Sequence, residues 1–411
     1  MSFKKTIAAA FTTAGSMGTA AANFLLAAVL IPRLAPADYG GYSFALVAIQ
    51  LGFNISNALT ATPMSMDIAQ GRLDTSRLNV YGTVSLMLCS AMVALVFVNL
   101  FFNNIVLLEA FLLGAAAFTA LLRWYGRTYC FNAGRRSIAL QADIAYTVAL
   151  TGGAAFLFFE DSGVTLIHAA LALLVANILS FITFIHTHFF SSFTFRLWKG
   201  MREYVPVFRE NAFWALILVV LSEAAVNAHV YLVTYSRGLE AYAPLALALL
   251  FWRPVSTVIS AVGQSERPKI AKLLNESNSF KMNQHMMWFR MILVSAFLLN
   301  LLVVILFIVF LGNIWLAKFP QEEIFISVCI ASGMMLCRVL RVPDTVYCQA
   351  SGDAKRVAKI AWIAAPTSIA VTALFLFNFE LAALSMFGVL VGDAILLFGT
   401  RWVAKSKRRS L

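Results

Sequence analysis

An arginine within an apolar segment is the residue of this sequence with the clearest chemical meaning. Arg253 lies near the middle of the segment 245–262, whose length and composition are typical of a membrane-spanning helix. A guanidinium in hydrocarbon is costly, so such residues are retained at functional sites, normally with a partner. A fixed positive charge at this depth predicts an anionic ligand.

Four polar stripes accompany this arginine, each with the three- or four-residue spacing that places side chains on one face of a helix. The stripes are Thr12, Ser16, Thr19 and Asn23; Gln50, Asn54 and Asn57; Glu223, Asn227, Tyr231 and Thr234; and Arg253, Ser256, Ser260 and Gln264. Polar side chains in a membrane bundle turn toward protein or water, so the coordinated pattern predicts one central, water-accessible cavity. For any single Ser, Thr or Asn, hydrogen bonding between helices is the alternative role.

Two carboxylates and two prolines complete the candidate site. Glu223 lies at a depth similar to that of Arg253 on the preceding helix, which predicts an ion pair in the empty cavity. An anion, or protonation of the carboxylate, would then release the arginine; a purely structural pair is the alternative. No partner is assigned to Asp393. We expect its carboxylate either to couple transport to a proton or sodium ion or to form a hydrogen bond within the bundle. Pro63 and Pro254 predict bends, either gating hinges or static kinks.

Composition identifies the elements that must position these residues. Hydrophobic residues make up 61% of the chain, charged residues only 12%, and the mean hydropathy is +0.82, which excludes an ordinary soluble domain. The apolar runs are long and continuous, unlike the short alternating segments of an outer-membrane barrel. We therefore predict an all-α polytopic membrane protein with twelve transmembrane helices. They are expected at 7–31, 41–66, 79–102, 105–123, 139–159, 163–188, 209–235, 241–262, 287–311, 324–341, 358–378 and 381–402.

The basic residues predict the orientation of these helices. With the N-terminus inside, all of the 31 Lys and Arg residues except Arg33, Arg237, Arg253 and Lys318 fall in cytoplasmic segments or at their flanks, which makes 27. This asymmetry is what the positive-inside rule requires, so both termini are expected in the cytoplasm. It assigns several arginines to cytoplasmic helix ends, among them Arg123, Arg127, Arg290, Arg338 and Arg341. The net charge of +12 then reflects topology beside anionic headgroups and does not indicate nucleic-acid binding.

An internal similarity predicts two like halves. Residues 122–134 and 340–352, each at the end of the fourth helix of a half, coincide at Leu122/Leu340, Arg123/Arg341, Tyr129/Tyr347, Cys130/Cys348 and Gly134/Gly352. Because each half has an even number of helices, the two should be parallel, related by an axis along the membrane normal. We expect an N-terminal lobe at 1–190, a cytoplasmic interfacial linker at 191–208, a C-terminal lobe at 209–404 and a basic tail at 405–411.

Other kinds of chemistry find no support in the sequence. The five histidines lack metal-ligand spacing, and no cofactor is expected. The five cysteines are odd in number and imply no disulfide framework. Because no nucleotide-binding glycine loop and no nucleophile elbow occur, we expect a carrier and not an enzyme. Its energy would come from a gradient, the membrane potential or consumption of the product.

Two turns resemble motifs of a known family. Residues 31–42, IPRLAPADYGGY, resemble the R-L-x-P-x-x-Y-G-x-Y turn of polysaccharide exporters, and residues 131–135, FNAGR, are similar to that family's polar turn ending in Gly-Arg. With the hydropathy profile, the whole chain resembles Wzx-type oligosaccharide (O-antigen) flippases of the MOP superfamily. The resemblance implies a V-shaped, two-lobed, MATE-like bundle with alternating access in a bacterial inner membrane.

The same resemblance implies a cargo and partners. The cargo would be an undecaprenyl-diphosphate-linked oligosaccharide, moved from the cytoplasmic to the periplasmic leaflet for O-antigen, capsule or exopolysaccharide synthesis. A polysaccharide polymerase and a chain-length regulator would be the partners. A cationic cavity is typical of the family; Arg253 fits it, with Arg33 at the outer mouth. The chain departs from the family in having few other cavity cations.

Two other classes of protein stay open. A MATE-type cation-coupled multidrug antiporter shares the twelve-helix architecture and would favour acidic cavity residues; Glu223 and Asp393 suit it, whereas Arg253 does not. An integral-membrane polysaccharide polymerase or ligase would need a sizeable extracytoplasmic loop with catalytic groups. The predicted outer loops are short, the longest near 312–323.

Overall fold

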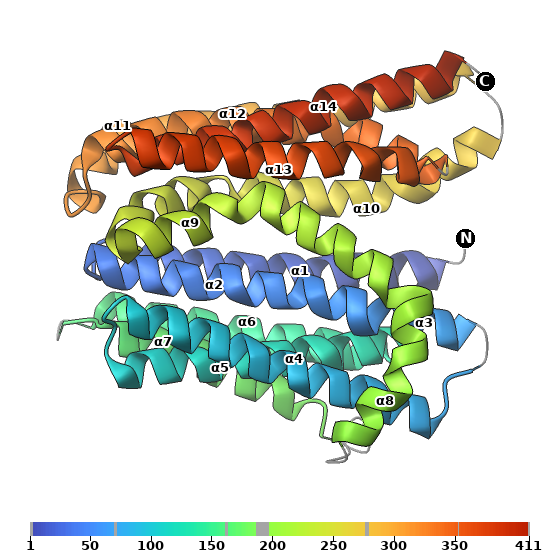
Figure 1. The fold of residues 1–411 in the computed structure, drawn as a ribbon, viewed down its shortest axis with the longest axis horizontal. Helices are drawn as coiled ribbons and strands as arrows, with labels where there is room; N and C mark the ends of the chain where they lie inside the picture. The colour runs from blue at the N-terminus through green and yellow to red at the C-terminus, as the bar shows by residue number, and fades with distance from the viewer. Residues whose placement is uncertain are drawn as a thin grey trace. The chain divides into compact units, whose positions relative to one another are not determined.

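A computed structural model describes residues 3–69, 72–160, 163–185, 197–275, 279–351 and 353–409. These described residues are predominantly helical and contain no β-strand, in agreement with the predicted all-α class (Figure 1). The chain divides into two compact units, Met1–Val220 and Leu221–Leu411.

Each unit is a bundle of long helices. The first contains α1 (Phe3–Leu30), α2 (Pro36–Ser56), the π-helical turn η1 (Asn57–Ala61), α3 (Thr62–Ala69), α4 (Thr75–Phe102), α5 (Leu107–Asn132), α6 (Arg136–Phe159), α7 (Leu166–Ile182), α8 (Leu197–Val207) and the π-helical turn η3 (Phe208–Ala212). Helix α9 (Phe213–Phe251) leads into the second, which continues with α10 (Arg253–Asn275), α11 (Ser279–Trp315), α12 (Gln321–Ala350), α13 (Ala354–Asn378), the 3₁₀ turn η4 (Ala382–Ser385) and α14 (Met386–Arg409).

The same pattern of neighbouring helices occurs in both units. In the first, α5 packs against α2, α4 and α7, and α7 also packs against α6. In the second, α12 packs against α10, α11 and α14, and α14 also packs against α13, as Figure 1 shows. Helices α5 and α12 carry the two similar sequences 122–134 and 340–352. The similarity therefore corresponds to a repeated arrangement of helices.

Many of these helices are suited to a bilayer. Within the described residues, nine helical stretches are long and apolar enough to cross a membrane. Two further apolar helices, Gly15–Leu30 and Leu166–Ile182, are shorter. One of the nine stretches, Ala215–Phe251, contains a sharp kink at Gly238, where φ is +82°. The exact number of crossings and the cytoplasmic location of the termini stay predictions.

Helices α5 and α12 extend further than expected. The predicted segments end at 123 and 341, whereas α5 continues to Asn132 and α12 to Ala350. Gly134 follows α5 with φ of +75°, a left-handed conformation that glycine adopts readily after a helix end. Arg123 and Arg341 consequently lie well inside helices, and their assignment to helix ends was wrong.

Two arginines bind the ends of corresponding helices. Both terminal nitrogens of Arg33, which follows α1, donate to the carbonyls of Phe158 and Glu160 at the end of α6. In the second unit, Arg237 donates to the carbonyls of Leu376, Phe379 and Glu380 at the end of α13. The last carbonyls of a helix lack partners within it, and a cation there is also favoured by the helix dipole.

The predicted interfacial linker is partly described. Residues 191–196 lie outside the described part of the chain, and α8 follows them. Helix α8 is fixed to the first unit by Tyr204, whose hydroxyl donates to the Leu59 carbonyl at 2.6 Å and whose ring lies edge-on to Tyr81. Most of the predicted linker therefore belongs to the first compact unit.

Helices α13 and α14 approach closely through glycines. Gly388 and Gly392 form a small-xxx-small pair on α14, which allows two helix backbones to come together. A Cβ atom at Gly392 would lie 2.9 Å from the Cβ of Ser368 and 3.5 Å from the Ala364 carbonyl oxygen. Alanine at this position must therefore push α13 away.

We expect Gly392→Ala to destabilise the protein by about 1–3 kcal/mol, because extra volume in a packed contact forces neighbouring atoms to shift. Thermal unfolding in mild detergent measures this change. Gly152→Ala is the control, since a Cβ there meets nothing within 4 Å. Equal melting temperatures for the two variants would contradict the close packing.

Candidate functional site

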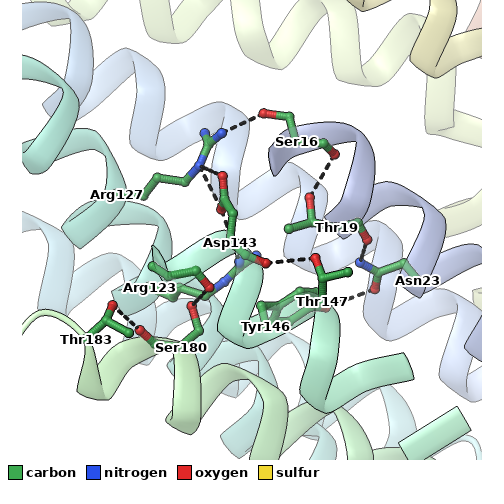
Figure 2. A network of polar contacts seen from close by, with 11 residues as sticks. Ser16, Thr19, Asn23, Arg123, Arg127, Asp143, Tyr146, Thr147, Ser180 and Thr183 are labelled. Carbon is green, nitrogen blue, oxygen red and sulfur yellow. Dashed lines mark hydrogen bonds and ion pairs between the residues drawn. The ribbon is translucent and has the colours of Figure 1, made fainter. Parts of the chain in front are cut away.

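An aspartate held by arginine lies inside the first unit (Figure 2). Arg127 of α5 donates from Nε to both carboxylate oxygens of Asp143 on α6, at 3.0 Å each. Its Nη2 donates to the hydroxyl of Ser16 on α1 at 2.6 Å. The Asp143 side chain is 3% exposed, so this is a buried ion pair. It connects α1 with the consecutive helices α5 and α6.

A second arginine adjoins the same carboxylate. Arg123 is 6% exposed, and its Nη1 lies 3.7 Å from Asp143 Oδ1. Its guanidinium carbon lies 3.9 Å from the centre of the Tyr146 ring, which is a cation–π contact. Nε and Nη1 are buried without a hydrogen-bond partner in the described chain. Two positive charges thus share one negative charge.

Two residues of the predicted stripes, Asn23 and Asn57, make contacts beside this cluster. Asn23 accepts a hydrogen bond from the Tyr146 hydroxyl at 3.0 Å, and its amide donates to the Thr19 carbonyl (Figure 2). Asn57, the first residue of η1, accepts from the indole of Trp124 at 3.0 Å. That indole in turn lies 5.3 Å from the guanidinium carbon of Arg127.

The second predicted helix contains a π-helical turn close to Pro63, and the bend expected there stays a prediction. The π-helical turn Asn57–Ala61 precedes Pro63, and such turns are often found at functional sites. Gln50, which is exposed, donates to Asn54 Oδ1 at 3.4 Å, so these two stripe residues do share a face.

In the second unit, Glu223 and its stripe form a separate group on α9. Glu223 is 7% exposed and accepts hydrogen bonds from Asn227 Nδ2 at 2.7 Å and from the Tyr231 hydroxyl at 3.4 Å. The predicted one-face spacing is therefore realised. The expected ion pair between Glu223 and Arg253 is absent from the contacts of the described residues, and that prediction was wrong.

Arg253 follows a break between two helices. Helix α9 ends at Phe251 and α10 begins at Arg253, with Trp252 as a turn between them. Pro254 explains the break, since it lacks the N–H for a helical hydrogen bond and its ring crowds the preceding turn. Within the described residues, the partly exposed side chain of Arg253 makes no hydrogen bond or ion pair.

Helix α11 holds this break in place. Asn300 donates to the Phe251 carbonyl at 2.9 Å, and so supplies a donor where the helix is interrupted. Phe297, one turn earlier, stacks on the indole of Trp252 with ring centres 5.0 Å apart. The position from which Arg253 extends is thus fixed on both sides of the turn.

We expect Asn300→Leu to destabilise the protein by about 1–3 kcal/mol, because the Phe251 carbonyl would lose its donor. Thermal unfolding in detergent measures this loss. Asn378→Leu is the matched control, since its amide also bonds a helix carbonyl, that of Leu374, but at an exposed position. If both variants lost the same stability, the hydrogen bond at the break would contribute no more than an ordinary exposed one.

The remaining stripe residues on α10 lie after the break. Ser256 donates to the Trp252 carbonyl at 3.3 Å, and Ser260 is exposed. The side chain of Gln264 lies outside the described part of the chain. Their contact with a ligand stays a prediction, as does that of Arg33, whose terminal nitrogens bind helix carbonyls.

Asp393 has partners that the sequence reasoning missed. It is 2% exposed; Arg338 Nε donates to its Oδ2 at 2.7 Å, and Arg341 Nη1 lies 3.2 Å from its Oδ1. Asp344, one turn beyond Arg341 on α12, pairs with Arg290 of α11. The repeat alignment of Arg123 with Arg341 was the available signal, because each adjoins a buried aspartate.

Comparison with known proteins identifies the fold. No protein-family model matches the sequence, and no curated protein matches it. A multidrug resistance MATE family transporter of the MOP superfamily, solved in an inward-facing conformation, is similar over 94% of both chains, with a TM-score of 0.64 and 12% identity. The eukaryotic MATE transporter AtDTX14 is similar over 99% of this chain and 98% of its own, with a TM-score of 0.59 and 13% identity.

A third solved structure is also similar to this chain. A MOP superfamily transporter from Pyrococcus furiosus has a TM-score of 0.58 and 13% identity, with 98% of this chain and 96% of that chain covered. It is described as having a binding pocket of reverse polarity that suggests a different function. At these identities the likeness shows the fold: the chain has the MATE-like architecture of MOP superfamily transporters.

Proposed function

We propose that this protein is a flippase that moves an anionic lipid-linked oligosaccharide, of the undecaprenyl-diphosphate type, across the bacterial inner membrane. Its fold is shared with transporters, which supports movement of a cargo by alternating access. The lipid tail stays in the bilayer while the diphosphate and sugars cross through the protein. The translocated oligosaccharide is then used in the synthesis of a surface polysaccharide.

The main support for this proposal is that Arg253 has no carboxylate partner among the described residues. The arginines at 77, 123, 127, 290, 338 and 341 each adjoin a buried aspartate, whereas Arg253 has no such neighbour in the described chain. An unmatched guanidinium beside a helix break is suited to a diphosphate, since its planar fork forms paired, charge-assisted hydrogen bonds with phosphate oxygens.

Glu223 favours a second candidate, a cation-coupled MATE-type antiporter. A buried carboxylate that accepts from an amide and a phenol can exchange a proton or bind a cation. The buried aspartates, Asp67, Asp143, Asp344 and Asp393, are each matched by arginine, so their negative charge is already neutralised and does not favour a cationic drug.

Reconstitution distinguishes the two. The purified protein is placed in liposomes with a polyprenyl-diphosphate oligosaccharide that carries a reducible fluorophore on the sugar. With a flippase, an impermeant reductant bleaches the inner-leaflet label as well as the outer. If that label stays protected while ethidium is expelled on a proton or sodium gradient, the antiporter is correct and the flippase is excluded.

A further inference from the structure

Pro63, in the second predicted helix, cannot give a backbone carbonyl the donor that an ordinary residue would supply. It has no N–H for the carbonyl four residues earlier, which belongs to Leu59, and in a regular helix its ring also crowds that carbonyl. The chain here forms the π-helical turn η1, in which the Thr62 N–H donates to the carbonyl of Asn57, five residues earlier. The donor that Leu59 would have received from an ordinary residue at 63 must therefore come from another group.

The hydroxyl of Tyr204, on α8, supplies that donor. It donates to the Leu59 carbonyl at 2.6 Å, so two segments far apart in the sequence meet at this bond. Tyr204 is 7% exposed, and burial raises the pKa of its phenol, so the hydroxyl keeps its proton and can donate. Its ring lies edge-on to Tyr81 of α4 and tilted against Phe208 of η3, which holds the hydroxyl in place.

A similar arrangement occurs at the proline break of the second unit. There the carbonyl of Phe251, three residues before Pro254, accepts from Asn300 of α11 at 2.9 Å. Both prolines lie in the predicted second helix of a half, and at both a side chain from another helix donates to a carbonyl just before the proline. The local backbone at each proline therefore depends on a separate helix.

The bond of Tyr204 connects a candidate site residue with the segment between the two units. Asn57 is the first residue of η1 and accepts from the Trp124 indole at 3.0 Å, so its position depends on the turn. On the other side of the bond, α8 continues into a second π-helical turn, η3, which packs against η1. Helix α9 follows directly and crosses the boundary between the units after Val220.

We propose that α8 is a conformational catch for the π-helical turn η1, with the Tyr204 hydroxyl as its point of contact. While the hydroxyl bonds to Leu59, the turn is stabilised and Asn57 stays in place beside Trp124. Withdrawal of α8 leaves the Leu59 carbonyl without this donor, which destabilises the turn. The turn and α8 therefore open together. The catch lies within the first unit and is independent of the cargo.

Hydrogen–deuterium exchange of the purified full-length chain in detergent tests this coupling. Tyr204→Phe keeps the ring and removes only the hydroxyl. Amide exchange in 57–64 and in α8 should both become about five- to tenfold faster, because the two segments lose the bond that they share. Tyr146→Phe is the matched control, since it removes a hydroxyl that bonds to Asn23 elsewhere in the same unit. It should leave exchange in both segments unchanged.

Three results of this exchange experiment would overturn the proposal. They are unchanged exchange in Tyr204→Phe, faster exchange in α8 alone, and the same acceleration of both segments in Tyr146→Phe. The first two would show that the turn does not depend on the hydroxyl. The third would show that loss of any buried hydroxyl loosens the whole unit.

A pair of backgrounds tests whether the hydroxyl replaces the N–H that Pro63 lacks. Pro63→Ala provides an amide N–H for Leu59. Tyr204→Phe should lower the melting temperature by about 2–4 °C in the parent protein and by much less in the Pro63→Ala background, where the carbonyl keeps a donor. Equal losses in the two backgrounds would contradict the proposal. If Pro63→Ala does not fold, the exchange experiment, which needs only the tyrosine variants, decides.

Discussion

Replacing Asp143 with alanine should destabilise the protein by about 3–5 kcal/mol, because it leaves buried arginines without their counterion. Arg127 would lose the acceptor of both its Nε bonds, and Arg123 would keep only the Tyr146 ring. For a bundle of this size, the melting temperature in detergent should fall by about 6–20 °C.

An aspartate whose two partners are solvent-exposed provides the control for this prediction. Asp353→Ala removes contacts to Arg356 and Lys407, whose side chains are 60% and 35% exposed, so the loss should be at most about 1 kcal/mol. Adding Arg127→Met to the Asp143→Ala background should restore part of the stability, because it removes one unmatched charge. A double variant less stable than Asp143→Ala would show that the pair is not the source of the effect.

The sequence predicts the helical class and the repeat because both depend on local pattern. Apolar runs define the helices, and the similarity of 122–134 to 340–352 corresponds to the shared neighbours of α5 and α12. The stripe on α9 is likewise correct, since hydrogen bonds between Glu223 and Asn227 follow from helical spacing alone.

Partners from distant segments could not be predicted in this way. Arg123 and Asp143 lie on different helices, and so do Arg338 and Asp393. A hydropathy profile places the end of a membrane span at an arginine. A nearby carboxylate neutralises that arginine, so the helix can continue beyond it. Pairing of Arg253 was predicted from similar depth, but depth does not determine which way a side chain points after a helix break.

Replacing Arg253 with glutamine should reduce flipping of a diphosphate-linked cargo by about 100-fold, because charge-assisted hydrogen bonds to the phosphate are worth about 3 kcal/mol. Arg253→Lys keeps the charge and loses the planar fork, so about tenfold of activity should be lost. The liposome bleaching assay, with rates divided by the amount of folded protein, measures both.

Stability separates this functional role from a structural one. Since Arg253 has no partner in the described chain, Arg253→Gln should melt at the same temperature as the parent protein or higher. Arg401→Gln, which removes an exposed arginine of α14, should leave both flipping and melting unchanged. An Arg253→Gln protein that melts early and flips at the normal rate per folded molecule would reverse the assignment, making this arginine a structural residue of the break at Trp252.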